Sequence, residues 1–463
     1  MPEENRSGAL YAQPSIVYLN MQEMLLRMRD VYGGNKTLRE AGTKYLPMFL
    51  EEEDREYRAR IKTLTIPNYL KEAIGGYVGR IFAKPTTPGD DFDDDMKAWW
   101  EDLDRVGSKA DVFFRNVVTA GIRDGICWVL VDMPRSTATN LREEREQNIR
   151  PYCRRYDALD VLFVEADEMG RIIDFRVRES RYQTVDYVQR EVKIVRRYTP
   201  GKCEIYNEST GAVQEFPLSF PAERGVPVVP YIAASDVGTG YYVESPMLDL
   251  ADLSIRLWNS QAEQDNCLHI ARCPILFARG WRPTTENQNI VVTSMHAYCA
   301  DTPEASLQWV EHSGSALNTG KDDIETLKRE IQAVGLKPLL STGGSARTAT
   351  EVESDEARAT SPLRNMADNA QDMIENVLKY MAIWSGKEDG PSIALNSNFE
   401  LAAYDANAIT TLISMKGEGL VTKQTILKEA QRRGLISDDV DIVKELEAAN
   451  AEDQAESHGE GEE

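Results

Sequence analysis

The sequence predicts an α+β protein in which a block of β-strands lies between two helical parts of the chain. Three observations predict this fold class. Over residues 18–124, apolar residues recur every three or four positions, as they do on one face of a helix. Residues 126–232 instead carry short β-branched runs separated by glycine, proline and polar turn residues. From Ser245 onward the helical spacing returns and dominates the rest of the chain.

Size and charge narrow the class of protein. A chain of 463 residues can form two or three structural units, each with its own core. Its apolar runs are far shorter than the roughly 20 residues that span a bilayer. The N-terminus has neither a basic leader nor an apolar stretch, so we expect a cytoplasmic protein whose six cysteines stay reduced. The net charge is −23, and because proteins that bind DNA by neutralising phosphates are basic, a conventional DNA-binding protein is not expected.

Four helices are predicted before the strands. The first carries Met21, Leu25 and Met28 at helical spacing, and Gly33-Gly34 ends it. The acidic run Asp90–Asp95 could be read as a cation site, but carboxylates also suit the N-terminus of a helix, and we favour that interpretation. The four helices are predicted over residues 18–31, 52–64, 68–82 and 109–124.

The strands begin with Ile126–Asp132, whose apolar, β-branched residues predict a buried strand. An antiparallel meander is predicted over residues 152–232, because short apolar runs alternate there with turn residues. The prolines of Val226–Pro230 favour an extended backbone. The strands of the meander are predicted over residues 160–165, 172–179, 182–187, 192–198 and 203–206.

Two long helices are predicted after the meander, with short strands between them. Ser245 is a typical N-cap and Pro246 suits the first helical position, so we predict a helix from Pro246 to about Ile270. A helix of about 25 residues is about 37 Å long and needs neighbouring helices for stability. The second helix is predicted over residues 322–334, and the short strands over 274–278, 290–294 and 307–310.

A further long helix is predicted over residues 348–385. Pro362 lies within it and predicts a kink, because proline removes one backbone hydrogen bond and clashes with the preceding turn. Shorter helices are predicted over residues 406–416, 423–433 and 439–448, before an acidic tail that we expect to be disordered. The core stripe of the long helix is Leu363, Met366, Ala370, Met373, Val377, Leu378 and Met381.

No motif predicts a catalytic residue, a metal site or a cofactor. The segment Gly314–Asp322 resembles a phosphate-binding loop, but its glycines are one residue too far apart and Asp322 would repel phosphate. We therefore interpret Gly320 as the end of a loop. A histidine-based triad is not excluded, although nothing points to one. A zinc site could be imagined from residues whose spacing does not place them on one face: Cys267, His269, Cys273, His296 and Cys299.

The glycine-rich loop over residues 341–347 has two interpretations. It could be a plain connector between helices, which the sequence alone favours. It could instead be a mobile finger that faces a ligand, because Lys337 and Arg347 flank it and basic groups can contact phosphates.

The order of these elements resembles the portal (head–tail connector) family of tailed bacteriophages over about residues 40 to 447. No single motif is diagnostic, and the joint order of the motifs carries the resemblance. The motifs are YLPMF at 45–49, GGYVGRIFAKP at 75–85, DGICWVLVDMP at 124–134, RPY at 150–152, YDA at 156–158, SPMLDLADL at 245–253, TATE at 348–351, LNSNF at 395–399 and GLISDD at 434–439.

The resemblance implies a portal-type fold with an α/β wing, two long stem helices, a small α/β clip, a kinked long helix and a helical C-terminal crown. It also implies that a tunnel loop faces DNA through Lys337, Ser341, Thr342, Gly343, Gly344, Ser345 and Arg347, with Pro362 at the helix kink. The parts would be a wing (1–244), a stem helix (245–270), a clip (271–320), a second stem helix (321–338), the tunnel loop (339–347), the kinked helix with a return to the wing (348–405), a crown (406–448) and the acidic tail (449–463).

The resemblance further implies a virion protein that carries out no reaction. Members of the portal family form a dodecameric ring at one capsid vertex, and double-stranded DNA is packaged and ejected through this ring. The ring is assembled in the host cytoplasm. The expected partners are terminase, a head-completion or adaptor protein, and the major capsid and scaffold proteins, with no membrane, cofactor or metal. Carboxylates repeated around such a ring would weaken the binding of passing DNA.

Two alternatives remain at this point. The chain could be another virion structural protein, such as a scaffold or capsid component, although scaffolds are mostly helical and the strands over residues 152–232 argue against one. It could also be a metal-dependent enzyme of nucleic-acid metabolism whose acidic clusters hold Mg²⁺, but no acidic motif supports this.

Overall fold

The computed structural model describes residues 10–89, 91–134, 142–143, 147–234, 236–272, 275–279, 306–310, 315–336, 349–395, 414–416, 421–432, 440, 442 and 444–446. The chain divides into two compact units, Met1–Ser397 and Asn398–Glu463. The second unit contains helix α13 (Lys423–Arg432), where Gln431 donates a hydrogen bond to the carbonyl oxygen of Val440 at 3.1 Å. All other elements described below belong to the first unit.

Helices precede the strands, as predicted, and side chains cap several of them. They are α2 (Ile16–Gly33), α3 (Asn35–Ala41), the 3-10 helix η1 (Gly42–Lys44), α4 (Asp54–Thr63), α5 (Tyr69–Ile81), α6 (Asp94–Trp100) and α7 (Ala110–Asp124). Ser15 accepts a hydrogen bond from the backbone N–H of Tyr18 at the start of α2. At the start of α6, Asp93 accepts one from Met96 at 2.7 Å. Asp93, Asp94 and Asp95 therefore lie at a helix N-terminus, as we expected, while Asp91 accepts a hydrogen bond from the backbone N–H of Ser392 and Asp90 lies outside the described residues.

The first sheet has three antiparallel strands in the order β3-β2-β9. They are β3 (Tyr152–Asp157), β2 (Ile126–Asp132) and β9 (Val228–Ile232). The central strand pairs Trp128 with Tyr156 on one side and with Pro230 on the other. All residues of β2 except Asp132 are buried, which confirms the buried strand that the sequence predicts.

The second sheet is a five-stranded antiparallel meander in the order β4-β5-β6-β7-β8. Its strands are β4 (Val161–Ala166), β5 (Ile172–Val185), β6 (Val188–Thr199), β7 (Lys202–Asn207) and β8 (Val213–Pro217). The single meander expected over residues 152–232 is thus wrong, because its first and last strands pair with β2 instead. The two strands predicted over 172–179 and 182–187 are one strand, and β8 was not predicted.

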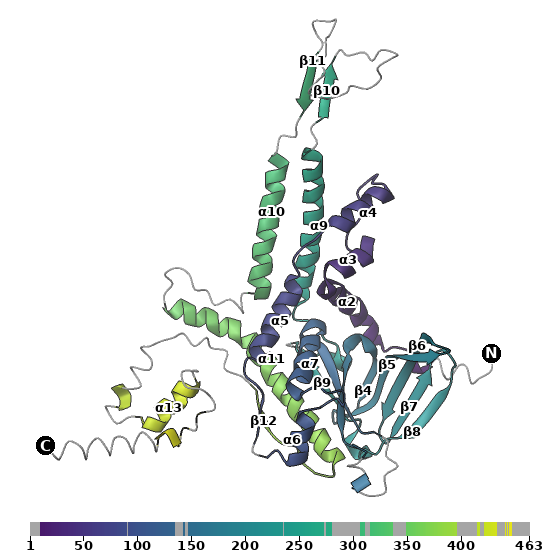
Figure 1. Ribbon diagram of the computed structural model, residues 1–463, viewed down its shortest axis with the longest axis vertical. Coiled ribbons are helices and arrows are strands. Elements are labelled where there is room, and N and C mark those ends of the chain that lie inside the picture. Colours follow the sequence, from purple (N-terminus) through teal and green to yellow (C-terminus); the bar gives the residue numbers. More distant parts are fainter. Residues whose placement is uncertain are drawn as a thin grey trace, which may run out of the picture. The chain divides into compact units, whose positions relative to one another are not determined.

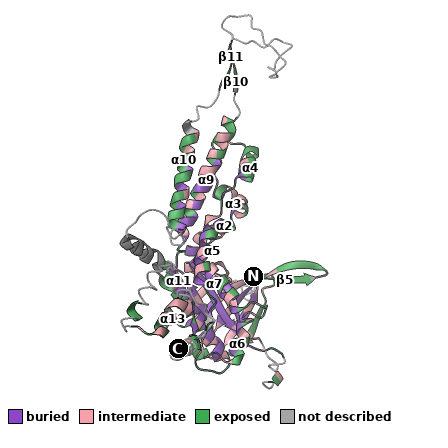
Figure 2. Ribbon diagram, turned by 60° about the vertical axis from the view of Figure 1, so that its left-hand side comes forward, coloured by how far each residue is buried: buried purple, intermediate pink, exposed green. Residues whose placement is uncertain are grey.

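The core of the first unit lies where helix α2 and the two sheets meet, and Figure 2 shows buried residues concentrated around the sheets. Aromatic rings fill it, with the ring of Phe175 at 5.6 Å from that of Trp128 and at 6.4 Å from that of Tyr198, measured between centroids. Two short 3-10 turns connect strands, η2 (Ala158–Asp160) between β3 and β4 and η3 (Ala222–Arg224) between β8 and β9, and a third, η4 (Thr239–Tyr241), follows β9.

The C-terminal part of the first unit is built from long helices and two small strand pairs. These elements are α9 (Leu248–Ala271), β10 (Ile275–Arg279), β11 (Ser306–Val310), α10 (Ser315–Ile331), the π-helical turn η5 (Gln332–Leu336) and α11 (Ala349–Trp384). Strand β12 (Ile393–Ala394) pairs with β1 (Thr87–Pro88). None of the helices in the described part of the chain has the length and hydropathy needed to cross a bilayer.

Two predicted helix starts are wrong. Helix α9 begins at Leu248 because Ser245 and Pro246 form a turn, in which the backbone N–H of Leu248 donates to the carbonyl oxygen of Ser245. The hydroxyl of Ser245 is buried and bonds Ile122 and Met247 instead of capping the helix. Helix α10 begins at Ser315, well before the predicted Asp322.

Helix α11 covers the three-stranded sheet with its predicted stripe. Every residue of that stripe is buried, from Leu363 to Met381. Near its C-terminal end, the indole N–H of Trp384 donates to the carbonyl oxygen of Val131 at 3.1 Å. Tyr231 of β9 donates its hydroxyl to the carbonyl oxygen of Met366.

Candidate functional site

The candidate site is the antiparallel pair of helices α9 and α10 with the hairpin β10–β11 that connects them. Figure 1 shows the two helices side by side, leading away from the sheets. Polar contacts join them along their length. Ser260 donates to Asp323 at 3.3 Å, and Gln264 donates to the carbonyl oxygen of Leu317 at 3.0 Å. Arg256 lies 3.7 Å from the same Asp323.

Two glycines of this segment allow the close approach. A Cβ atom at Gly320 would lie 2.1 Å from Oε1 of Gln264, and one at Gly335 would lie 2.7 Å from Cδ2 of Leu250. Gly320 is therefore a packing position within α10, and our interpretation of it as the end of a loop is wrong. The sequence alone does not distinguish these roles, because they depend on what α9 places opposite.

Burial along the pair is uneven. Helical spacing predicts a stripe of Ile324, Leu327, Ile331 and Val334; the first three are buried in α10, whereas Val334 lies in η5 and is 49% exposed. In α9, no residue from Glu263 to Ala271 is buried, and Ile270 is 58% exposed. The buried residues of α9 are Leu250, Ala251, Ser254, Leu257, Trp258 and Ala262. The half of α9 next to the hairpin therefore has a surface that a neighbouring molecule could cover.

The hairpin β10–β11 is a two-stranded sheet with exposed aromatic residues. Its register pairs Leu276 with Trp309 and Phe277 with Gln308. Because paired residues share a face, Phe277 and Trp309 lie on opposite faces, and they are 52% and 54% exposed. The sequence predicts both strands but gives no sign that these two residues are exposed, since an apolar residue in a strand usually faces a core. Among the residues that the structure describes, no third strand pairs with β10 or β11, and a two-stranded sheet alone is at best marginally stable.

The helix pair is negatively charged. Helix α9 has four carboxylates and one arginine, and α10 has four carboxylates and three basic residues. Asp252 forms an ion pair with Arg27 of α2 at 3.0 Å, which ties the base of α9 to the N-terminal helices. The remaining excess of carboxylates would repel a polyanion that passes close to it.

The predicted tunnel-loop residues lie outside the described residues. These are Lys337, Ser341, Thr342, Gly343, Gly344, Ser345 and Arg347. The structure does describe what flanks them, because η5 ends at Leu336 and α11 begins at Ala349. Helix α11 continues through Pro362, and the kink there stays a prediction.

The buried acidic residues near the sheets are held in ion pairs. Glu179 of β5 lies 3.1 Å from a nitrogen of Arg196 and 3.2 Å from one of Arg154, and it accepts a hydrogen bond from Tyr156 at 2.6 Å. Burial alone would raise the pKa of Glu179, but Arg196 and Arg154 outweigh it and hold that pKa below its usual value. Asp157 is similar, since Arg155 and Arg123 outweigh burial and lower its pKa. These groups stabilise the fold as charged pairs.

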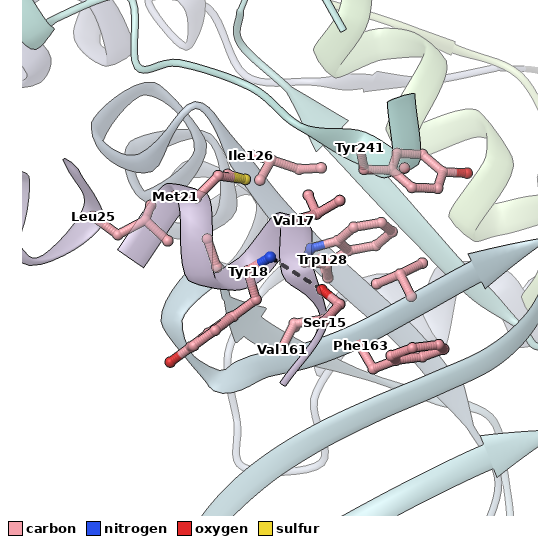
Figure 3. Close-up of a pocket in the computed structure, with 13 residues that line it drawn as sticks. Ser15, Val17, Tyr18, Met21, Leu25, Ile126, Trp128, Val161, Phe163 and Tyr241 are labelled. Carbon is pink, nitrogen blue, oxygen red and sulfur yellow. Dashed lines mark hydrogen bonds between the residues drawn. The ribbon is translucent and has the colours of Figure 1, made fainter. Parts of the chain in front are cut away.

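The cavity shown in Figure 3 is too small for a substrate. It measures about 40 Å³ and lies between α2, β2 and β4, lined by apolar residues such as Met21, Trp128 and Val161. Sites for small molecules usually measure several hundred Å³. No group of three metal-ligating side chains is found in the described parts of the chain. Of the imagined zinc ligands, Cys267 and His269 are exposed on α9, while Cys273, His296 and Cys299 lie outside the described residues.

Comparison with known proteins gives one family match and several similar structures. Residues 246–385 match a domain of unknown function, DUF4055, which covers less than half of the chain. This range contains the helix pair, the hairpin and all of α11. The comparison with curated proteins gave no match.

The similar structures come from gene transfer agent (GTA) particles. A chain of the virion of a native GTA particle is 10% identical, with a TM-score of 0.46 over 79% of this chain and 89% of that chain. A chain of the neck of an empty GTA particle is 10% identical, with a TM-score of 0.48 over 79% and 90%. A chain of the neck of a native GTA particle is 12% identical, with a TM-score of 0.45 over 77% and 88%. Similarity at this level does not establish a shared function.

Proposed function

We propose that the chain is a portal-type virion protein, whose copies form a closed ring that conducts double-stranded DNA. In this proposal the ring has twelve copies and occupies one capsid vertex. The helix pair α9–α10 is the stem, and the hairpin β10–β11 belongs to the clip that contacts terminase and later an adaptor protein. The major capsid and scaffold proteins would contact the ring elsewhere. The protein carries out no reaction and needs no cofactor.

The observation that carries this proposal is the incomplete burial of the helix pair and its hairpin. Helix α9 has no buried residue beyond Ala262, and Phe277 and Trp309 of the hairpin are more than half exposed on opposite faces. Helices and hairpins of this kind need neighbours. A head-to-tail arrangement of identical copies supplies a neighbour on both sides of every hairpin, and it closes into a ring when the rotation between copies allows it.

The charge of the pair supports a conduit over a DNA-binding protein. The carboxylates of α9 exceed its single arginine, and the whole chain has a charge of −23. A repulsive wall lets a polyanion slide without binding, whereas a protein that holds DNA needs basic groups. Lys337 and Arg347 would supply weak, local phosphate contacts within that repulsive surface.

The mass of the assembled protein tests the proposal. Native mass spectrometry of the full chain should give a species close to twelve times the 52.1 kDa of one copy. Another virion structural role would give shells or small oligomers instead. Metal-dependent turnover of a nucleic-acid substrate by a monomer would contradict the proposal and favour an enzyme.

A further inference from the structure

Strands β5 and β6 extend beyond their sheet as a two-stranded arm, defined as residues Ser180–Lys193. Strand β4 pairs with β5 up to Val177 and no further, and β7 pairs with β6 only from Ile194 onward. Between these limits β5 and β6 pair with each other alone, out to the pair Val185–Val188. Figure 2 shows this arm as an exposed ribbon that leaves the body of the sheet.

The arm exposes large apolar side chains near its tip. Tyr182 is 70% exposed, Val188 is 57% exposed, and Tyr187 is fully exposed. A ribbon of two strands has two free edges and no core, so by itself it is marginally stable. Within the described part of the chain, no third strand pairs with the arm, so it lacks the neighbour that a two-stranded ribbon needs.

The turn at the tip keeps a tyrosine where glycine would fit better. Asp186 and Tyr187 have φ angles of 50° and 62°, which is the left-handed region at both central positions of the turn. Asn-Gly or Asp-Gly is preferred there, because a bulky side chain at the second position is unfavourable. A strained residue with a fully exposed ring is a reason to look for a function of that ring.

The charge of the arm is opposite to that of the chain. The arm carries Arg181, Arg190 and Lys193 against Asp186 and Glu191, whereas the chain as a whole has a charge of −23. The arm therefore has a net charge of +1 and is attracted to the acidic surface of a second copy. DNA would also attract the cations of the arm, but the exposed apolar side chains at its tip suit a protein surface better than a phosphate backbone.

We propose that the arm of one copy binds an acidic surface of a second copy, with Tyr187 as its apolar anchor. Aromatic residues that become buried at the centre of an interface often dominate binding. This inference rests on the proposed assembly of identical copies and adds to it a contact made by the wing-forming sheet, apart from the helix pair. It predicts that the arm is needed for assembly while the fold of one copy does not need it.

Site-specific photo-crosslinking of the full-length assembled protein identifies the partner of the tip. We expect benzoylphenylalanine in place of Tyr187 to give crosslinked dimers, with the crosslink in a peptide rich in Asp and Glu. The matched control places the same group at Met169, which is 79% exposed in the turn between β4 and β5, and should give no dimer. Crosslinks only within one chain, only to nucleic acid, or none in assembled protein would overturn the proposal.

Replacement of Tyr187 by glycine separates assembly from folding, because the two should change in opposite directions. Y187G relieves the turn, so the melting temperature of the subunit should stay the same or rise, while the concentration needed for half-assembly should rise at least tenfold. The charge-reversed variant R190E/K193E should assemble as poorly as Y187G, whereas the conservative variant R190K/K193R should assemble like the wild type. Arg181 is left unchanged because it lies 3.5 Å from the buried Glu179.

The outcomes also distinguish this inference from the proposed function. If the wild type forms rings and Y187G forms them equally well, the arm proposal fails and the ring stands. If the wild type is a monomer at every concentration, both fail.

Discussion

Gln264 of α9 lies over Gly320 of α10, and its amide oxygen occupies a position 2.1 Å from where a Cβ atom at residue 320 would be. The same side chain donates a hydrogen bond to the carbonyl oxygen of Leu317. The glycine thus sets how closely the two helices approach near the hairpin. Helix propensity alone would favour alanine at this position, so the contact with Gln264 opposes the local preference.

Replacement of Gly320 by alanine should therefore not stabilise the protein. In a helix the change from glycine to alanine normally gains up to about 1 kcal/mol. At Gly320 the new methyl group displaces Gln264 and breaks its hydrogen bond, which costs about as much. Gly79 of α5 is the matched control, because a Cβ there meets nothing within 4 Å. We expect urea unfolding to show a gain of about 0.5–1 kcal/mol for G79A and none for G320A, and equal gains would contradict the account.

Replacement of Glu179 by glutamine should destabilise the fold and change its response to acid. The substitution leaves Arg154 and Arg196 without their shared carboxylate, which should cost about 3 kcal/mol in the free energy of unfolding at pH 7. The folded-state pKa of Glu179 lies below its unfolded value of about 4.3. Its contribution is therefore present above that value and is lost as the pH falls through the lower, folded pKa.

Urea midpoints measured from pH 7 to pH 3 test both the loss of stability at pH 7 and the changed response to acid. The wild type should lose stability below about pH 4.3, and E179Q should lose less over the same interval. A variant as stable as the wild type at pH 7 would show that Glu179 is not a stabilising partner of these arginines.

Replacement of Trp309 by serine should weaken assembly and leave the subunit folded. The indole is 54% exposed in a single copy, so its loss should change subunit stability by only about 0.5 kcal/mol. If a neighbouring copy packs against this indole in the assembled ring, the loss of the side chain should weaken self-association at least tenfold, or by about 1.4 kcal/mol. Mass photometry over a concentration series measures this, with M169S as a control for loss of an exposed apolar residue. Equal assembly by W309S and M169S would remove the hairpin from the interface.

Prolines in the glycine loop should impair DNA packaging without affecting the ring. The double variant G343P/G344P restricts a loop that we propose faces DNA, because proline fixes one backbone angle at each position. The control is G343A/G344A, which restricts the backbone less. A packaging assay should show a larger loss for the proline pair, with rings of normal mass in both. Normal packaging by the proline pair would remove the loop from the mechanism.

The sequence predicts best the elements whose apolar pattern is decided locally. The continuous apolar run of β2 is buried as predicted, because both faces of that strand lie against the core. The stripe from Leu363 to Met381 is also buried as predicted, because it forms the one face of α11 that packs on the sheet. The length of a strand is predicted less well where neither of its faces is buried. Residues 180–193 carry no apolar alternation, so the sequence predicts shorter strands than β5 and β6, which form one long hairpin there.

Positions set by a neighbouring element are not predicted at all. Ser245 has the chemistry of an N-cap, yet its hydroxyl bonds Ile122 of α7, which is far away in the sequence. Glycine is common at the end of a loop, yet Gly320 lies within α10 and packs against Gln264 of α9. The candidate surface depends in the same way on exposure in the folded subunit, so Trp309 and Tyr187 could not be identified from their sequence context.

Electron microscopy of the purified full-length protein tests the central claim most directly. The account predicts annular particles with an open centre, built from copies whose stems lie side by side and whose hairpins gather at one rim. A homogeneous population of separate subunits at high protein concentration, with no annular particles, would contradict it.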